Sequence, residues 1–182
     1  MTAMSVELEI RPVKRRDFLF VATRAVAAVG TALATWPLID NMNPDASVLS
    51  YSSVEVDLRP IAEGQRITVR WRGGPVFIDH RDPARIAQAQ ADDTSPGLID
   101  PAADSSRVKN PAWLIIIGVC THLGCIPLGQ SDQEPRSEFD GWFCPCHGSK
   151  YDTSGRVRHG PAPRNLNVPS YEFKSPDVVR IG

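Results

Sequence analysis

Two short segments hold the residues of this chain that are best suited to chemistry. Their sequences are Cys120-Thr-His122-Leu-Gly-Cys125 and Cys144-Pro-Cys146-His147-Gly-Ser149, and together they contain all four cysteines and two of the four histidines. Thiolates and imidazoles are both good ligands for transition metals. The candidate metal ligands are one thiolate and one imidazole from each segment: Cys120, His122, Cys144 and His147.

Three kinds of site are compatible with these donors. Two thiolates can hold one iron of a [2Fe–2S] cluster while two imidazoles hold the other iron. A zinc site can use the same residues, but zinc leaves the second cysteine of each segment, Cys125 and Cys146, unexplained. Two plain disulfides would suit an exported protein, but both histidines would then be incidental. We favour the cluster because it uses both histidines and brings the two segments together, so that a disulfide between Cys125 and Cys146 could clamp them.

The two segments resemble the paired cluster-binding sequences of the Rieske iron–sulfur subunit of bacterial cytochrome bc complexes. A later segment is similar to the proline loop of that family: Gly160, Pro161, Ala162 and Pro163. The resemblance implies one Rieske-type [2Fe–2S] cluster per chain, held by the four candidate ligands, and a disulfide between Cys125 and Cys146. It also implies that Ser149 and Tyr151 tune the cluster by hydrogen bonds. His147 would contact the quinol and accept its proton, and Leu123 would pack against the quinol pocket.

The function that this resemblance implies is electron transfer within quinol–cytochrome c reductase. The subunit would oxidise quinol together with a cytochrome b subunit and pass the electron to a c-type cytochrome subunit, with release of a proton. The expected assembly is a dimeric complex in the membrane. Two alternatives remain open: a Rieske ferredoxin or oxygenase component, which typically lacks the two disulfide cysteines, and a zinc-stapled, membrane-tethered binding module. A net charge of −1 gives no sign of a nucleic-acid partner.

The N-terminal region has the pattern of an exported membrane protein. Residues 1–17 are polar and contain Arg15-Arg16, which resembles a twin-arginine export signal, although a simple positive-inside anchor is the alternative. Residues 18–39 are apolar except for Arg24, and their 22 residues would form a helix of roughly 33 Å, enough to cross a bilayer. We predict an uncleaved single transmembrane helix rather than a cleaved signal peptide. The N-terminus would then be cytoplasmic and the remaining chain periplasmic, at the bacterial inner membrane.

The chain after the predicted helix divides into a linker and a β domain. Residues 40–53 are small and polar without a hydrophobic period, and we interpret them as a flexible hinge. Residues 54–182 alternate apolar and polar side chains in the manner of strands, which predicts a mainly β, Rieske-type antiparallel domain. Within it we expect a small cluster-binding subdomain at about residues 112–163.

Individual elements of the β domain can be predicted from local patterns. Apolar residues 113–119 predict a fully buried strand that delivers Cys120, and residues 142–143 deliver Cys144 in the same way. Asp82 followed by Pro83 predicts the start of a helix that runs to Ala91. We expect turns at Gly73-Gly74, a surface excursion over residues 92–111, and final strands at 166–173 and 178–181. His80 and His159, which lie outside both segments, are predicted to have surface or structural roles.

Overall fold

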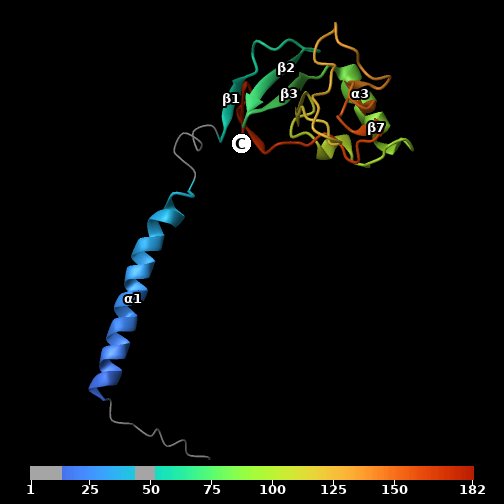
Figure 1. Cartoon of the computed structure of the whole chain (residues 1–182). Helices are drawn as coiled ribbons and strands as arrows, with labels where there is room; N and C mark the ends of the chain where they lie inside the picture. The colour runs from blue at the N-terminus through green and yellow to red at the C-terminus, as the bar shows by residue number, and fades with distance from the viewer. Residues whose placement is uncertain (1–13, 44–51) are drawn as a thin grey trace, which may run out of the picture. The chain divides into compact units, whose positions relative to one another are not determined.

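The computed structural model describes residues 14–43 and 52–182, and the chain divides into two compact units (Figure 1). The first unit contains helix α1 (Arg15–Asp40), which is long and apolar enough to cross a membrane by length and composition. Its apolar side chains are exposed along its length. The predicted apolar helix is therefore confirmed and begins at the twin-arginine pair. Most of the predicted hinge, residues 44–51, lies outside the described residues.

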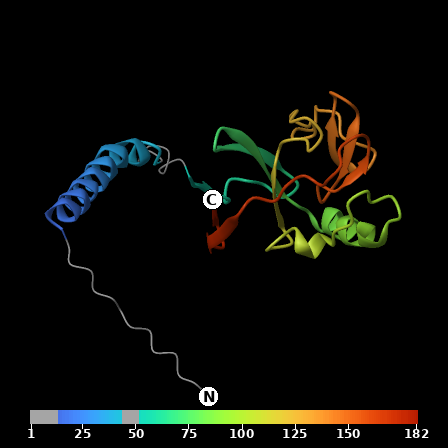
Figure 2. The same cartoon turned by 60° about the horizontal axis from the view of Figure 1, so that its bottom comes forward.

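The second unit is built from antiparallel strands, as predicted (Figure 1 and Figure 2). Over residues 52–182 the strands form three three-stranded sheets. One sheet has the order β1 (Val54–Asp57), β9 (Val178–Ile181) and β8 (Tyr171–Ser175). The middle sheet has the order β2 (Arg66–Trp71), β3 (Gly74–His80) and β4 (Trp113–Ile117). The third sheet, which carries the candidate site, has the order β5 (Asp140–Cys144), β6 (Ser149–Asp152) and β7 (Val157–His159).

The middle sheet is covered on both faces, which explains the continuous apolar run in β4. Because side chains alternate along a strand, Leu114 and Ile116 join one core together with Cys120 and Cys144. Ile115, between them, joins a second core with residues of β1, β8 and β9. The buried strand predicted ahead of Cys120 is therefore confirmed, although β4 ends at Ile117.

The helix that follows β3 forms as its sequence predicts. Helix α3 (Pro83–Ala91) has Asp82 as its N-cap, and the Asp82 carboxylate accepts a hydrogen bond of 2.7 Å from the Arg85 N–H. Such a cap satisfies one of the N–H groups that the first helical turn leaves without an intrahelical partner. The turn between β2 and β3 lies one residue earlier than predicted, at Arg72-Gly73, because Gly74 already pairs with Trp71.

Two sequence predictions are wrong. The strand predicted at residues 166–173 starts only at Tyr171, as β8, so residues 166–170 belong to no strand. Leu166 is instead fully buried in the core beside Cys120 and Cys144, where it packs as part of an irregular segment. Residues 92–111 are not a simple surface excursion either, because Asp104 is 1% exposed and forms a 2.7 Å ion pair with the buried Arg81.

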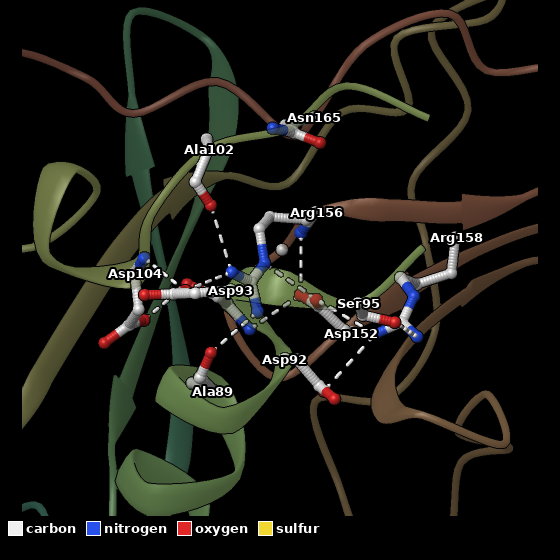
Figure 3. Close-up of polar contacts among 12 residues, drawn as sticks. Ala89, Asp92, Asp93, Ser95, Ala102, Asp104, Asp152, Arg156, Arg158 and Asn165 are labelled. Atoms are coloured by element: carbon white, nitrogen blue, oxygen red, sulfur yellow. Dashed lines mark hydrogen bonds and ion pairs between the residues drawn. The ribbon is translucent and has the colours of Figure 1, made fainter. Parts of the chain in front are cut away.

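A buried polar network attaches this segment to the third sheet (Figure 3). The segment contains the short 3-10 helices η1 (Asp92–Thr94) and η2 (Asp104–Ser106). Arg156, in the turn between β6 and β7, is fully buried and pairs with Asp152 at 2.8 Å and with Asp93 at 2.5 Å. It also donates a 2.8 Å hydrogen bond to the carbonyl of Ala89 in α3. The end of α3 and η1 are thereby fixed to the sheet that carries the candidate site.

Candidate iron–sulfur centre

Two loops carry the predicted ligands, and one covalent bond joins them. Residues 120–125 follow β4, and residues 145–148 connect β5 to β6. A disulfide links Cys125 to Cys146, with 6.7 Å between their Cα atoms, so the predicted pairing is confirmed. Each loop also closes on itself by a 3.0 Å backbone hydrogen bond, from Gly124 to the Cys120 carbonyl and from Gly148 to the Cys144 carbonyl. The two loops are therefore compact and held against each other.

The other two cysteines and the two histidines gather at this junction. Cys120 and Cys144 are not in a disulfide and are 3% and 2% exposed, respectively. The Cys144 sulfur lies within 4.8 Å of both disulfide sulfurs. The rings of His122 and His147 have centroids 4.7 Å apart and are almost perpendicular, at 89°. The structure thus brings the imidazoles of both loops together beside the linked loop ends.

The donor set fits a [2Fe–2S] cluster. Nδ1 of His122 is buried and, within the described residues, has no hydrogen-bond partner, which is the state expected of an imidazole nitrogen that coordinates a metal. Two thiols that no disulfide uses and two imidazoles are the donors that a Rieske-type centre requires. The His147 side chain is exposed, so part of its ring is open to other molecules.

Burial and hydrogen bonding act in opposite directions on the two thiols. Burial alone would raise the pKa of Cys120, but the Tyr151 hydroxyl and the His122 backbone N–H favour the thiolate, and the pKa of Cys120 falls below its ordinary value. Burial raises the pKa of Cys144, and the neighbouring Cys120 raises it further. The pKa of Tyr151 is also raised, first by burial and then by Cys120, so this phenol remains a hydrogen-bond donor.

The predicted tuning residues lie directly behind the ligands. Ser149 and Tyr151 are fully buried, and the Tyr151 hydroxyl lies 3.2 Å from the Cys120 sulfur. The Ser149 hydroxyl accepts a 3.2 Å hydrogen bond from the N–H of Ala162 in the proline loop. Gly160 is required at the start of that loop, because a Cβ there would lie 2.6 Å from the Ser149 Cα. The proline loop is therefore packed against the second ligand segment.

Sequence reasoning missed one residue that connects the first ligand segment to the proline loop. The Thr121 hydroxyl donates a 2.5 Å hydrogen bond to the carbonyl of Arg164, one residue beyond the loop. Nothing in the spacing of the chain predicts this contact, since its partner is a backbone carbonyl 43 positions away.

The remaining predicted residues are Leu123, in the first ligand segment, and the two histidines outside both segments. Leu123 is 71% exposed, and Ile126, which follows the first ligand segment and was not predicted to contribute, is 56% exposed. His80 stacks on Trp113 with 3.9 Å between ring centroids, and its Nδ1 lies 2.8 Å from the carbonyl of Ile61. His159 is exposed on β7. His80 therefore has a structural role and His159 lies at the surface, as predicted.

The antiparallel sheets and the two disulfide-linked ligand segments define a Rieske-type iron–sulfur domain. Residues 103–172 match the family described as Rieske [2Fe-2S] domain. Residues 10–45 match the family described as Ubiquitinol-cytochrome C reductase Fe-S subunit TAT signal.

Relatives with curated names are similar over nearly the whole chain. The ubiquinol-cytochrome c reductase iron-sulfur subunit of Rhodospirillum rubrum is 58% identical over 168 residues, which are 92% of this chain and 91% of that protein. The cytochrome b-c1 complex subunit Rieske, mitochondrial, of Neurospora crassa is 47% identical over 91% of this chain and 69% of its own length. A solved structure of a hyperthermophilic respiratory Complex III has a TM-score of 0.50 and 25% identity, and the match covers 87% of this chain and 97% of that chain.

This chain belongs to the family of ubiquinol–cytochrome c reductase iron–sulfur subunits. It is a Rieske subunit of a cytochrome bc1 complex and a component of an oxidoreductase. The predicted family, the Rieske [2Fe–2S] cofactor and the twin-arginine signal are confirmed. The export signal and helix α1 together fit a membrane-anchored subunit of a respiratory complex. These matches set aside the zinc-stapled module and the oxygenase component.

Proposed function

We propose that Cys120, His122, Cys144 and His147 hold the [2Fe–2S] cluster and that this site takes one electron from quinol. The observation that carries the proposal is the position of the two imidazole rings. Their centroids lie 4.7 Å apart, in the two loops that also hold the buried cysteines outside the disulfide. Neutral imidazoles in place of two thiolates make the centre less negative, so that when bound it supplies a one-electron acceptor of high potential.

His147 is the residue that meets the quinol and accepts its proton. Its side chain is exposed, whereas His122 is half-buried and has a buried Nδ1. A quinol hydroxyl could therefore hydrogen-bond to the exposed side of the His147 ring. With the cluster held by the other ring nitrogen, charge withdrawal by oxidised iron would favour loss of the ring N–H proton, and the bared nitrogen could then accept the proton of the quinol while the cluster accepts its electron. Leu123, exposed beside His122, provides an apolar contact for the quinol pocket.

Electron transfer by such a subunit requires two partners, one that binds the quinol and one that accepts the electron. A cytochrome b subunit contributes the quinol pocket, and a c-type cytochrome subunit takes the electron onward, within a dimeric complex. The name of the Neurospora crassa relative, which includes cytochrome b and c1, supports this assignment. Residues 40–53 serve as the hinge between the anchor and the domain that carries the cluster.

The proposal includes an orientation of the chain in the membrane. Residues 1–17 are cytoplasmic, α1 crosses the inner membrane, and residues 54–182 are periplasmic. The disulfide supports this orientation because disulfides persist in oxidising compartments such as the periplasm. The twin-arginine signal, which belongs to a bacterial export pathway, supports it independently.

Two matched histidine variants test the ligand assignment. His147→Ala should abolish the electron paramagnetic resonance (EPR) signal of the reduced cluster and quinol oxidation. His159→Ala removes an exposed histidine outside the two loops and should preserve both. A full cluster signal in His147→Ala would overturn the assignment.

A further inference from the structure

The chain between the two ligand segments leaves and returns through a narrow neck. It leaves through residues 128–130, shortly after Cys125, and returns through residues 140–143, immediately before Cys144. Leu128 and Phe143 join these two arms by a pair of backbone hydrogen bonds, of 2.7 and 2.9 Å. We call residues 128–130 and 140–143 the neck. The neck therefore ties the chain just after the first ligand segment to the chain just before the second.

Arg66, on β2 of the middle sheet, holds both arms of the neck. Its side chain is fully buried, and Nη1 donates to the carbonyls of Gly129 at 2.8 Å and Gly141 at 3.3 Å. Nη2 donates to the carbonyl of Asp140 at 3.0 Å. Only a planar guanidinium offers several donors in one rigid fork, so one side chain can bridge two separate backbone segments.

The charge of Arg66 is balanced on the middle sheet itself. Its Nε forms a 3.0 Å ion pair with Asp79 of β3, which is 1% exposed. Asp79 also accepts a 3.1 Å hydrogen bond from Arg85. Because Asp79 orients the guanidinium from the other side, Arg66 is a fixed part of the middle sheet, and the neck docks onto it.

A second polar contact reinforces the neck from the same strand. The Gln130 side chain donates 3.0 Å hydrogen bonds to the carbonyl of Ile67 and to the hydroxyl of Thr68, both on β2. Its Oε1 accepts a 3.1 Å hydrogen bond from Nε1 of Trp142, in the other arm. The Arg66 guanidinium lies 4.3 Å from the centre of the Trp142 ring. Arg66 and Gln130 thus each connect β2 to both arms.

The neck is also packed tightly against the strand that carries the tuning residues. A Cβ at Gly141 would lie 2.2 Å from the carbonyl oxygen of Tyr151. Trp142 is fully buried in the same core as Cys120 and Cys144. A shift of the neck would therefore be transmitted to the ligands, since little free space separates them.

We propose that Arg66 is a positioning residue that acts as a second clamp on the cluster-binding loops. The Cys125–Cys146 disulfide fixes the loops at their tips, and Arg66, assisted by Gln130, fixes them at the neck. The inference rests on the ligand assignment under the proposed function. It implies that cluster retention depends strongly on Arg66 once the disulfide is reduced, because the two clamps act on the same two segments.

The test uses the full-length subunit in its purified membrane complex. Arg66→Met removes the fork with little change of volume, and Arg70→Met changes an exposed arginine of the same strand as a matched control. Cluster retention is followed by visible absorbance and EPR, with and without a thiol reductant that opens the disulfide. Hydrogen–deuterium exchange over residues 126–143 is measured in parallel, with residues 171–181 as an internal reference.

Under reducing conditions Arg66→Met should lose its cluster on the order of tenfold faster than the parent, while Arg70→Met should match the parent. Exchange should rise in residues 126–143 and stay constant in residues 171–181. Arg66→Lys should rescue retention only in part, because an ammonium keeps the pair with Asp79 but cannot bridge both arms. Gln130→Met is the milder variant if Arg66→Met folds poorly, and it should show a smaller effect in the same direction.

The proposal is overturned if both Arg66→Met and Gln130→Met keep the cluster as long as the parent under reducing conditions. An equal rise of exchange in residues 171–181 would also overturn it, since that result means general destabilisation. Cys120→Ser separates this failure from failure of the proposed function. If Cys120→Ser loses the cluster while both neck variants retain it, the ligand assignment stands and the second clamp does not. If Cys120→Ser retains an unchanged cluster, the ligand assignment itself fails and the clamp inference with it.

Discussion

The hydroxyl of Tyr151 lies 3.2 Å from the sulfur of Cys120, although 31 positions separate the two residues in the chain. The contact joins a buried phenol on β6 to the first proposed ligand. A hydrogen bond to a ligand sulfur stabilises the reduced centre more than the oxidised one, because reduction adds negative charge there.

Tyr151→Phe should therefore lower the midpoint potential and slow quinol oxidation. If the bond is worth about 1 kcal/mol more in the reduced state, the potential falls by roughly 40 mV, since a tenfold one-electron step is about 59 mV. Ser149→Ala should act in the same direction, and redox titrations of both variants provide the measurement. Potentials equal to that of the parent would mean that neither hydroxyl tunes the centre.

The disulfide gives a second prediction. Cys125→Ser should release the loop tips, reduce cluster occupancy and lower the free energy of unfolding by about 3 kcal/mol, the typical effect of closing a loop of this size. Occupancy is measured as iron per protein chain and stability by chemical denaturation. Cys146→Ser should behave identically, and the double variant should be no worse than either single variant. Additive losses would show that the two sulfurs act separately.

A pH dependence is expected from Glu134, near the neck. Its carboxylate accepts hydrogen bonds from the N–H groups of Gly129 at 2.8 Å and Gln130 at 2.9 Å. These bonds lower the pKa of Glu134 in the folded protein. When the pKa of a carboxyl group is lower in the folded than in the unfolded protein, the group contributes its full stability above the unfolded pKa, which is about 4.3 for glutamate. This contribution is lost as the pH falls through the folded pKa.

Thermal unfolding of the parent and of Glu134→Gln tests this dependence. At neutral pH the variant should be less stable by about 1 kcal/mol, because an amide oxygen is a weaker acceptor than a carboxylate. The difference between the two melting temperatures should shrink as the pH falls below about 4, while all other carboxylates contribute equally to both proteins. A difference that is constant with pH would contradict this role for Glu134.

The proposed hinge gives a prediction from the sequence alone, since residues 44–51 lie outside the described residues. Replacing Ala46 and Ser47 with prolines restricts φ at both positions. We expect slower quinol–cytochrome c reductase turnover with a normal EPR signal and midpoint potential. Glycine at the same two positions serves as the control and should preserve turnover. Turnover at the parental rate in the double-proline variant would mean that this segment is a passive spacer.

The sequence predicted the parts of this molecule whose signal is local. The run of apolar residues from Trp113 to Ile117 predicted β4 because both of its faces are buried, and Asp82-Pro83 predicted the start of α3 because capping depends on neighbouring residues. The four cysteines and the two histidines of the ligand segments identified the candidate site, because few kinds of site use two thiolates, two imidazoles and a further pair of cysteines.

The contacts that hold the site together were not predictable in the same way. Arg66 and Thr121 both donate to backbone carbonyls, which every residue has and which no side-chain pattern marks. The start of β8 was misplaced for a related reason. Leu166 is apolar enough for a strand, but the position of the core beside the ligand cysteines decides its conformation. Such contacts depend on the tertiary path of the chain.

Histidine ligation of the [2Fe–2S] cluster is tested most directly by pulsed EPR of the reduced full-length protein, prepared with and without ¹⁵N-labelled histidine. We expect a [2Fe–2S] signal with strong couplings from two histidine nitrogens that change on labelling, and loss of that signal in His147→Ala but not in His159→Ala. A reduced cluster without histidine couplings, or bound zinc in place of iron, would contradict ligation of the cluster by His122 and His147.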